Sequence, residues 1–315
     1  MSGMPDTVNT ADLVVQKLET AGFRAALIPF SCIKQITAIY DAYVENSGNL
    51  PFSLKENFRS NQPPDTAFEP LSFLVIAFHS SEGEIRLRHN GKEISLPIPP
   101  TYLDDSTMQR LDETLKQAVD GWQLARVKGI SLKLLAVMSG LGKYGRNNLG
   151  YVDGIGSHCN FCAFYTDIPC ESSAREPTLM DECGPCRLCE GNCPTGALGG
   201  VLPIDITRCL TMHNEFDAPI PDWLSPNVHH TVVGCLRCQE VCPVNITAKK
   251  SKKEPLELSE EETGLLLGQT PETLPSELVK KITDYGIWKN FISLAGRNIA
   301  LAIQAGQGGT NNAKR

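Results

Sequence analysis

The sequence predicts a mixed α+β and α/β protein with an N-terminal α/β domain, a cysteine-rich module and a short helical C-terminal element. Three observations predict this class. Short apolar runs of strand type alternate with amphipathic helical patterns through the first half of the chain. Eight of the twelve cysteines crowd between Cys183 and Cys242, and helical spacing of apolar residues returns after Ser259. The expected domains are residues 1–172, 173–248 and 249–315.

The elements of the first domain follow from hydrophobic periodicity and from turn residues. Asn90-Gly91 is the strongest hairpin signal, because both residue types tolerate the positive φ of a two-residue turn. The predicted helices cover residues 10–22, 32–44 and 105–127, and the predicted strands cover residues 25–28, 71–78, 84–88 and 93–97. The stretch 45–70 is expected to be a loop.

The composition is that of a globular protein. Of 315 residues, 41% are hydrophobic and 21% charged, and the formal net charge is −7. These values exclude collagen-like, disordered and coiled-coil classes. The negative charge argues against a large nucleic-acid surface, since such a surface needs excess Lys and Arg. The Lys-rich stretch 249–253 runs directly into the acidic stretch 254–262, which predicts a solvated linker without a binding role.

The sequence carries no sign of a membrane segment or a leader. No apolar run approaches the roughly 18–20 residues of a membrane span, and the first ten residues have neither a basic n-region nor an apolar h-region. We therefore expect a cytoplasmic protein with no membrane partner. In that reducing compartment, crowded cysteines bind metal more often than they pair as disulfides.

Two cysteine runs indicate the chemistry of the module. The first, from Cys183 to Pro194, reads C-x2-C-x2-C-x3-C-P without a gap. This spacing is typical of bacterial ferredoxins, in which three thiolates hold one [4Fe–4S] cube and the fourth reaches a second cube. The second run, from Cys235 to Pro243, reads C-x2-C-x3-C-P and lacks one cysteine in front, which Cys209 supplies. A ferredoxin-like module with two [4Fe–4S] clusters is therefore predicted.

The module has eight cysteines, the number of ligands that two [4Fe–4S] clusters need, and none is left over. The first ligand set, for the first cluster, is expected to be Cys183, Cys186, Cys189 and Cys242. The second ligand set, for the second cluster, is expected to be Cys193, Cys209, Cys235 and Cys238. Zinc is the alternative, but zinc sites use paired C-x2–4-C knuckles. Such knuckles explain neither the triple run nor the two Cys-Pro endings.

The remaining cysteines and the histidines near the module are weaker candidates. Cys159 and Cys162 form a C-x2-C pair and Cys170 follows, and burial beside the clusters is favoured over a redox or metal role. Cys32 is expected to be structural. His213 lies between two cluster cysteines and could tune a cluster's potential through a hydrogen bond, although a structural role is favoured. The pair His229-His230 is expected in a solvated loop.

Motifs ahead of the module complete a pattern. The run Gly140-Leu-Gly-Lys-Tyr-Gly-Arg-Asn-Asn148 precedes Gly156-Ser157 and then Tyr165-Thr-Asp-Ile-Pro169, and the double-cluster module follows. This order resembles epoxyqueuosine reductases and, more distantly, corrinoid-dependent reductive dehalogenases. The resemblance covers roughly residues 125–245.

The resemblance implies that the N-terminal domain holds cobalamin, a corrinoid, against one cluster, while a small reductant protein such as ferredoxin or flavodoxin supplies electrons. Reduced cobalt would remove an epoxide oxygen or break a carbon–halogen bond, so that the cofactors carry the chemistry. Tyr144 and Tyr165 are the candidate catalytic proton donors, because both flank the glycine-bearing segments. The residues expected to line the cofactor pocket are Gly140, Gly142, Gly145, Arg146, Asn147, Gly156 and Ser157.

Two departures from the epoxyqueuosine reductases bear on the substrate. Those enzymes carry an Asp followed by Thr before the glycine loop as their proton donor, whereas Arg126–Ser131 contains no carboxylate. The chain also shows no long helical-repeat tail of the kind that could clasp a tRNA. The main hypothesis is therefore a corrinoid-dependent reductase of an unidentified small molecule. The alternatives are an electron-transfer protein that feeds a partner enzyme, and a true epoxyqueuosine reductase acting on tRNA.

Overall fold

The computed structural model describes most of the chain. The described residues are 10–46, 66–102, 106–200, 204–248, 251–268, 272–287 and 289–308. They fall into two compact units, each made of several chain segments. The first unit takes residues 1–79, 106–153 and 159–184, and the second takes residues 80–105, 154–158 and 185–315. This division by contacts does not follow the three expected domains, whose boundaries stay a prediction.

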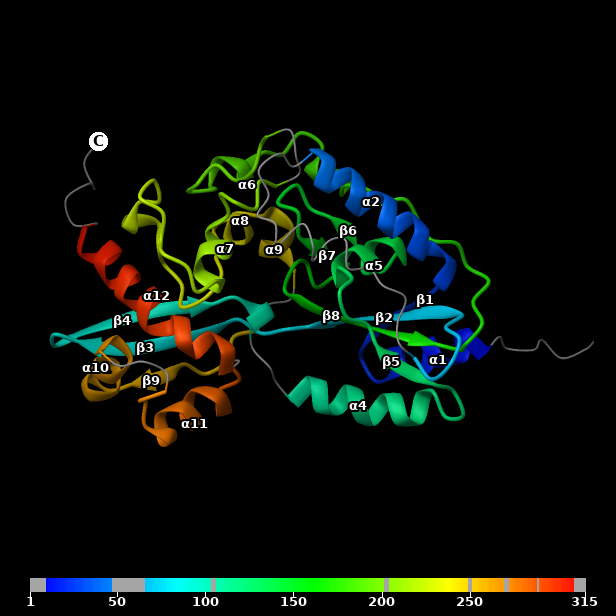
Figure 1. Cartoon of the computed structure of the whole chain (residues 1–315), viewed down its shortest axis with the longest axis horizontal. Helices are drawn as coiled ribbons and strands as arrows, with labels where there is room; N and C mark the ends of the chain where they lie inside the picture. The colour runs from blue at the N-terminus through cyan, green and yellow to red at the C-terminus, as the bar shows by residue number, and fades with distance from the viewer. Residues whose placement is uncertain are drawn as a thin grey trace, which may run out of the picture. The chain divides into compact units, whose positions relative to one another are not determined.

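The first unit is a three-layer arrangement around a four-stranded sheet in the order β1-β2-β8-β5, with every neighbouring pair antiparallel. Figure 1 shows helices on both faces of this sheet. The strands are β1 (Arg24–Pro29), β2 (Ser72–His79), β5 (Leu124–Arg126) and β8 (Cys159–Thr166). The helices are α1 (Thr10–Thr20), α2 (Ile33–Asn46), α4 (Ser106–Ala118) and α5 (Leu132–Met138).

Alternation along β2 divides the core of this unit between the two faces of the sheet. Leu74, Ile76 and Phe78 pack with α1 and α4 on one face. Phe73 and Val75 pack with α2 and α5 on the other. Because successive side chains of a strand point to opposite faces, a fully apolar strand is stable only when both faces are covered. This is the reason that residues 71–78 read as one continuous apolar run.

The long helix predicted over residues 105–127 is shorter than expected. Helix α4 ends at Ala118, and residues 124–126 form the edge strand β5 instead. Gly121 adopts a φ of +83°, which ends the helical path. The Asp167 carboxylate then accepts a hydrogen bond of 2.8 Å from the backbone of Gln123 and fixes the turn into the strand. The loop expected over residues 45–70 lies mostly outside the described residues.

The second unit contains the predicted hairpin, now β3 (Gly83–His89) and β4 (Lys92–Ile98). Asn90 and Gly91 have φ values of +52° and +68°, so the two-residue turn forms as the sequence predicts. A third strand, β9 (Leu256–Leu258), pairs with β3 in parallel. Helices α10 (Glu260–Gly268), α11 (Ser276–Asp284) and α12 (Lys289–Gly308) pack their apolar residues against this sheet.

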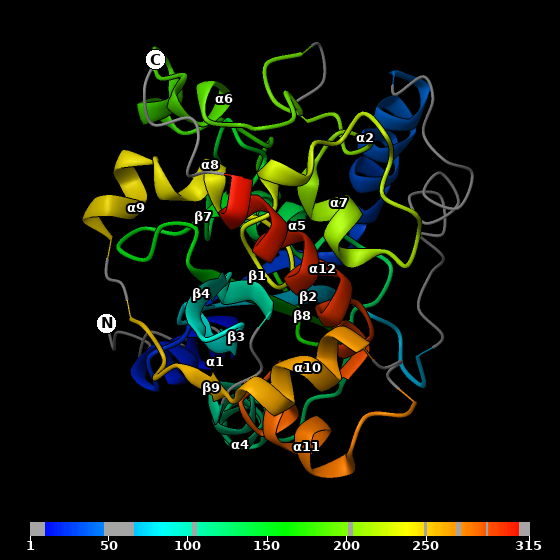
Figure 2. The same cartoon turned by 90° about the vertical axis from the view of Figure 1, so that its left-hand side faces the viewer.

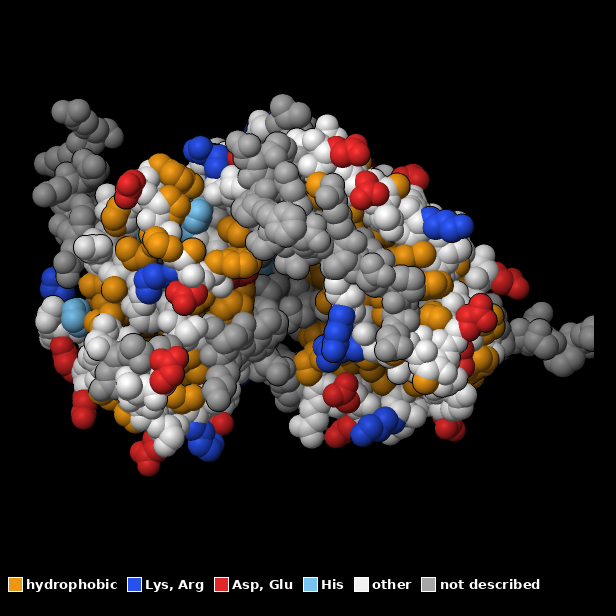
Figure 3. Space-filling model, viewed as in Figure 1, with side chains coloured by type: hydrophobic (Ala, Val, Ile, Leu, Met, Phe, Trp, Pro, Cys, Tyr) orange, Lys and Arg blue, Asp and Glu red, His pale blue; other side chains and the backbone are white. Residues whose placement is uncertain are grey.

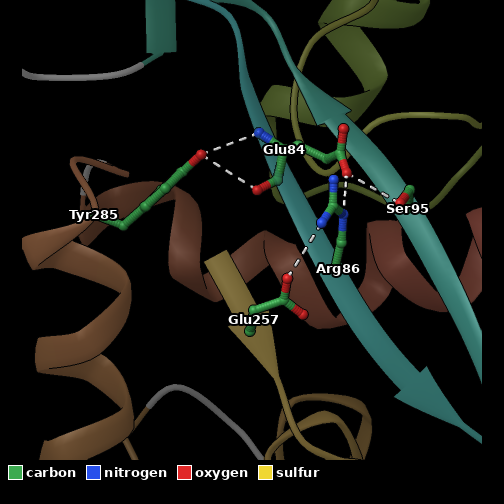
Figure 4. Close-up of polar contacts among 5 residues, drawn as sticks. All are labelled: Glu84, Arg86, Ser95, Glu257 and Tyr285. Atoms are coloured by element: carbon green, nitrogen blue, oxygen red, sulfur yellow. Dashed lines mark hydrogen bonds and ion pairs between the residues drawn. The ribbon is translucent and has the colours of Figure 1, made fainter. Parts of the chain in front are cut away.

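Strand β9 corrects the expectation of a solvated linker over residues 249–262. Leu256 and Leu258 are buried in the core of the second unit, while Glu257 between them faces outward and pairs with Arg86 at 3.6 Å. Figure 4 shows this ion pair beside the contacts that Tyr285 and Ser95 make with Glu84. The acidic composition concealed a short period-two pattern, which is the signature of a half-buried strand.

The remaining elements are short. The first unit adds the two-stranded sheet of β6 (Lys143–Tyr144) and β7 (Gly150–Tyr151), and the second adds α6 (Leu188–Gly191), α7 (Leu210–Glu215), α8 (Arg237–Glu240) and α9 (Pro243–Thr247). Single 3-10 turns cover Phe30–Cys32, Pro100–Tyr102, Asp181–Cys183 and Pro226–Val228. The mixed α and β class predicted from the sequence is confirmed. Among the described residues, no helix combines the length and apolar character that crossing a membrane requires.

The crossing of α10 and α12 generates a test of the packing of the second unit. A Cβ atom at Gly296 would collide with the backbone oxygen of Leu266, whereas a Cβ atom at Gly306 of the same helix would meet open space. Gly296→Ala should therefore lower the free energy of unfolding by about 1–3 kcal/mol through overpacking. Gly306→Ala should raise it by about 0.5–1 kcal/mol through helix propensity. Denaturant unfolding followed by circular dichroism measures both, and equal effects from the two variants would contradict the packing described.

Candidate functional site

Four cysteines of the second unit lie in very short helices or at their starts. Cys189 lies in α6 and Cys238 in α8, and these two helices pack against each other. Cys209 and Cys242 are the N-cap residues of α7 and α9, and Pro243 takes the first helical position that suits proline. The Asn192 side chain donates a hydrogen bond of 2.6 Å to the backbone oxygen of Arg237, which ties the two cysteine runs together.

Four thiols of the second unit form one electrostatic group. Burial, together with the neighbouring Cys209 and Cys193, raises the pKa of Cys235 to about 12. Burial likewise raises the pKa of Cys238 well above its usual range, with added contributions from Cys235, Cys209 and Cys193 and from Cys189 of the other predicted ligand set. These four residues are the predicted ligands of one cluster. Their crowding fits a positively charged iron–sulfur core, because such a core relieves the repulsion between thiolates.

Cys193 differs from the other three. Burial raises its pKa, but hydrogen bonds from Thr195 and from the backbone of Ala197 and Leu198 outweigh that effect and hold the pKa below its usual range. Backbone N–H groups that point at a sulfur stabilise the thiolate, the form that binds metal. The Cys-Pro-Thr-Gly-Ala turn therefore prepares this sulfur as a ligand.

The first member of the other ligand set belongs to the first unit. Cys183 is buried at the end of the 3-10 turn Asp181–Cys183. The backbone N–H of Arg146 lies 3.4 Å from its Sγ, and the Arg146 guanidinium donates to the backbone oxygens of Cys183 and Gly184. The sequence predicts Arg146 at a cofactor pocket, and the structure shows it bonded to the first residues of the cysteine run. Cys186, Cys189 and Cys242 lie in the second unit.

The glycines of the 140–148 loop face side chains and backbone of the chain itself. A Cβ atom on Gly140 would lie 2.5 Å from the Arg175 guanidinium, and one on Gly142 would lie 2.6 Å from the backbone oxygen of Tyr151. A Cβ atom on Gly145 would collide with the ring of Tyr151. These contacts explain the three glycines by internal packing, and they give no support to a corrinoid at this loop.

The other expected pocket residues divide between the units. Asn147 is buried in the first unit and donates to the Tyr151 hydroxyl at 2.9 Å. Gly156 and Ser157 belong to the second unit, where the Ser157 backbone donates to the Asn245 side chain at 2.9 Å. Ser157 and Asn245 are both buried, and with Gln239 they form a polar network beside Cys242. The sequence offered no signal for this network, because its members are 82 and 88 residues apart.

The two candidate proton donors have different surroundings. Tyr165 is buried on β8 with its ring 5.2 Å from that of Phe73, in the aromatic part of the core. Tyr144 lies on β6, and its hydroxyl is hydrogen-bonded to the Ser131 side chain near Tyr40. Burial raises the pKa of Tyr144 well above its usual range, and the neighbouring Tyr40 adds to the rise. A catalytic role for either tyrosine stays a prediction.

The cysteines outside the module have structural surroundings. Cys159 and Cys162 lie three residues apart on β8, so their side chains point to opposite faces of the sheet and cannot form one knuckle. Burial raises the pKa of each to about 12. Cys170 contacts the Ser172 hydroxyl at 3.0 Å, and burial raises the pKa of Cys32 to about 11. Within the described ranges, no three His, Cys, Asp or Glu side chains converge on a site for a single metal ion.

The histidines near the second ligand set are arranged differently from the expectation. His230, and not His213, is the histidine that approaches a sulfur, with its Nε2 atom 4.0 Å from Cys235 Sγ. That nitrogen also accepts a hydrogen bond from the Leu236 backbone at 3.3 Å. His213 contacts the backbone oxygen of Thr207, and His229 is buried against Asn214. The solvated loop expected for His229-His230 is therefore wrong.

Comparison with known families decides the nature of the module. Residues 182–245 match the family model described as a 4Fe-4S double cluster binding domain. The chain contains a 4Fe–4S double cluster binding domain. All eight predicted ligands of this double-cluster domain lie inside the matched range. The assignment of each cysteine to one cluster or the other stays a prediction.

The curated proteins that match include epoxyqueuosine reductases from several bacteria. The enzyme of Burkholderia pseudomallei (strain K96243) is 35% identical over 118 residues, which cover 35% of this chain and 29% of that enzyme. The match thus spans less than a third of the relative's length. It agrees with the resemblance read from the sequence and marks this chain as an iron–sulfur oxidoreductase resembling epoxyqueuosine reductase.

Solved structures extend the likeness to nearly the whole chain. Epoxyqueuosine reductase from Bacillus subtilis aligns with a TM-score of 0.63 and 19% identity over 98% of this chain and 87% of that one. An epoxyqueuosine reductase solved with an epoxyqueuosine-modified tRNA-Tyr stem loop aligns with a TM-score of 0.64 and 19% identity over 96% and 84%. At this identity the likeness establishes a shared fold. A catabolic reductive dehalogenase aligns with a TM-score of only 0.36.

The ligand assignment generates a direct test. Anaerobically purified protein should hold about eight iron atoms and eight acid-labile sulfides per chain, because each [4Fe–4S] cube takes four thiolates. Cys209→Ala should reduce the iron content to about four by removing one ligand of the second set. Cys32→Ala should leave the iron content unchanged, since that thiol lies outside the module. Iron analysis with paramagnetic resonance spectra checks all three, and zinc in the purified protein would refute the assignment.

Proposed function

We propose that the chain is a reductase of the epoxyqueuosine reductase type that acts on an epoxide carried by tRNA. The observation that carries the proposal is the double-cluster domain, joined to a fold shared with epoxyqueuosine reductases over nearly the whole chain. Removing an epoxide oxygen as water consumes two electrons and two protons. Clusters that pass one electron at a time suit this stoichiometry, and a small reductant protein of the ferredoxin or flavodoxin kind is the proposed donor.

The proposed substrate replaces the small molecule expected from the sequence. That expectation rested on a net charge of −7 and on the absence of a carboxylate between Arg126 and Ser131. The comparisons give it no support, because the curated relatives are epoxyqueuosine reductases and one such enzyme has been solved with a modified tRNA stem loop. On the face shown in Figure 3, Lys and Arg side chains are interspersed with Asp and Glu. Recognition of a few nucleotides demands less basic surface than binding a whole tRNA.

The hydroxyl group of Tyr144 is the proposed proton donor in place of the missing carboxylate. Ser131 begins α5 and bonds to both tyrosines of a small group, because its backbone N–H donates to the Tyr40 hydroxyl at 2.6 Å and its side chain bonds to Tyr144. Tyr144 carries its proton at neutral pH as an ordinary phenol does, and burial raises its pKa and makes it a weaker acid. It can therefore deliver this proton only to a strongly basic oxygen, and it can regain a proton through Ser131.

Cobalamin is proposed as a further cofactor on the strength of the sequence resemblance. When bound, it would supply the low-potential reductant that attacks the substrate. The glycine loop does not itself call for such a ligand, because Arg175 and Tyr151 fill the space next to its glycines.

An electron-transfer protein is the second candidate function. The contacts that fill the glycine loop, together with the missing carboxylate, favour it. A protein of this kind would reduce a partner and would show no turnover with an epoxide.

Binding of cobalamin separates these two candidates. Reconstituted protein mixed anaerobically with cob(II)alamin should retain about one equivalent through gel filtration and shift the optical spectrum of the corrinoid. Gly142→Val is a poor probe, because its side chain would meet the backbone of Tyr151 and disturb the fold. Arg175→Ala is a better probe of the glycine loop, since it opens space over Gly140 without disturbing the backbone. Unretained corrinoid in the unmodified protein would favour the electron-transfer function.

Activity on tRNA is the decisive test of the proposed function. Expression of the chain in cells that lack epoxyqueuosine reductase should restore queuosine in tRNA, and Cys209→Ala should abolish the effect by removing a cluster ligand. In a purified anaerobic assay, Tyr144→Phe should lower kcat by roughly 10²–10⁴, the usual contribution of a general acid, while iron content stays near eight. Queuosine that fails to appear, although cell extracts show a loaded protein, would contradict the tRNA substrate.

A further inference from the structure

The C-terminal helix α12 lies outside residues 182–245, yet it is bonded to both loops that carry ligands of the second set. We infer that Asn298 of α12 is a positioning residue that fixes Cys209 and Cys235 relative to each other. The inference rests on the assignment of these cysteines to one cluster. It goes beyond the proposed function, because it makes the helical C-terminal element part of the electron-transfer apparatus.

The first anchor of α12 is the end of α7. Cys209 begins this helix, and its last backbone oxygens have no partners within so short a helix. The Arg297 guanidinium donates to the backbone oxygens of His213 at 2.8 Å, Phe216 at 3.1 Å and Ala218 at 2.9 Å. One side chain of α12 therefore bonds to the last turn of the helix that starts at a ligand and to the chain that follows it. Figure 2 shows α12 running beside α7.

The second anchor joins that helix to the chain ahead of Cys235. The Nδ2 atom of Asn298 donates to the backbone oxygen of Asn214 at 2.9 Å and to that of Val232 at 2.8 Å. Asn298 and Asn214 have no exposed surface at all. Because the two hydrogens of one planar amide serve both oxygens, the spacing between α7 and residue 232 is fixed by the geometry of a single group.

Asn214 extends the connection to the residue next to the ligand. Its side chain donates to the backbone oxygen of Gly234 at 2.8 Å, and the Thr231 hydroxyl donates to the same oxygen at 2.9 Å. Gly234 has a φ of +63°, and a Cβ atom there would lie 2.5 Å from the Tyr102 ring. The peptide that leads into Cys235 is thus held by two donors and admits only glycine.

The two hydrogen bonds of the Asn298 amide differ in one respect from ordinary core packing. Removal of this amide takes a donor from the backbone oxygens of two buried residues, Asn214 and Val232, and an unpaired buried oxygen forces the loop to move. Cys209 and Cys235 are each only a few residues from the bonded oxygens. Loss of the Asn298 amide should therefore destabilise the second cluster before it affects the first.

The other ligand set offers a matched comparison. Asn245, which follows Cys242, has no exposed surface and bonds to Ser157 and to the backbone oxygen of Gln239. It braces a ligand of the first set in the way that Asn298 braces the second. Gln304 is an exposed residue of α12 that can serve as a neutral control.

The test uses full-length protein purified anaerobically. Asn298→Leu keeps the side-chain size but removes both donors, and it should reduce iron from about eight to about four per chain, leaving the spectrum of the first cluster. Asn245→Leu should give the opposite selectivity, and Gln304→Leu should leave both clusters intact. Equal loss of both clusters in the two buried variants, or full iron content in Asn298→Leu, would overturn the inference.

A milder variant keeps the inference testable if Asn298→Leu fails to fold. Thr231→Val removes one of the two donors to Gly234 and should retain about eight iron atoms. Its second cluster should nevertheless change its reduction equilibrium by about tenfold, or about 59 mV for one electron, while the first stays unchanged. Identical midpoint potentials in this variant and the unmodified protein would count against a positioning role. Cys209→Ala distinguishes a failure of the positioning role from a failure of the ligand assignment, since full iron content in this variant would refute the ligand assignment itself.

Discussion

The crowding of four partly buried sulfurs, those of Cys193, Cys209, Cys235 and Cys238, is the constraint on which the second unit depends. Burial and mutual proximity raise the pKa of Cys235 and Cys238 and so favour thiols over thiolates. A cluster reverses that balance only if the sulfurs are held where its iron atoms need them. The short helices in or beside which these cysteines lie cannot do this alone, because helices of four to six residues have little stability of their own. Polar side chains from distant segments supply the missing rigidity.

The first unit meets a different demand. Its antiparallel sheet, with both faces covered by helices, provides a rigid support for the loop that carries Tyr144 and for the chain that leads to Cys183. The side-chain hydroxyls of Tyr40, Ser131 and Tyr144 meet at the start of α5. Ser131 ends the stretch in which epoxyqueuosine reductases carry a carboxylate. A phenol holds its proton more tightly than a carboxylic acid. Chemistry that depends on it must generate a correspondingly stronger base.

The sequence predicted those features that depend on the spacing of residues close together in the chain. The cysteine runs and the Asn90-Gly91 hairpin are examples, because each is specified within a few residues. The sequence could not show that β9 joins the hairpin, or that Tyr151 rather than a ligand fills the space beside Gly142, since both depend on contacts between distant segments. The opposite orientation of Cys159 and Cys162 could have been predicted from the sequence, because it follows from strand periodicity once β8 is assigned.

The pairing of β3 with β9 has a consequence for the order of events during synthesis. Beside these strands, Ser81 and Ser251 meet at 2.6 Å although they lie 170 residues apart. Contacts of such long range form late, and domains complete their folding only after all their segments have left the ribosome. The hairpin therefore waits with one unpaired edge until nearly the whole chain has been made. Iron delivered earlier than this would meet the cysteine runs before their surroundings exist, so maturation of the metal centres belongs after translation.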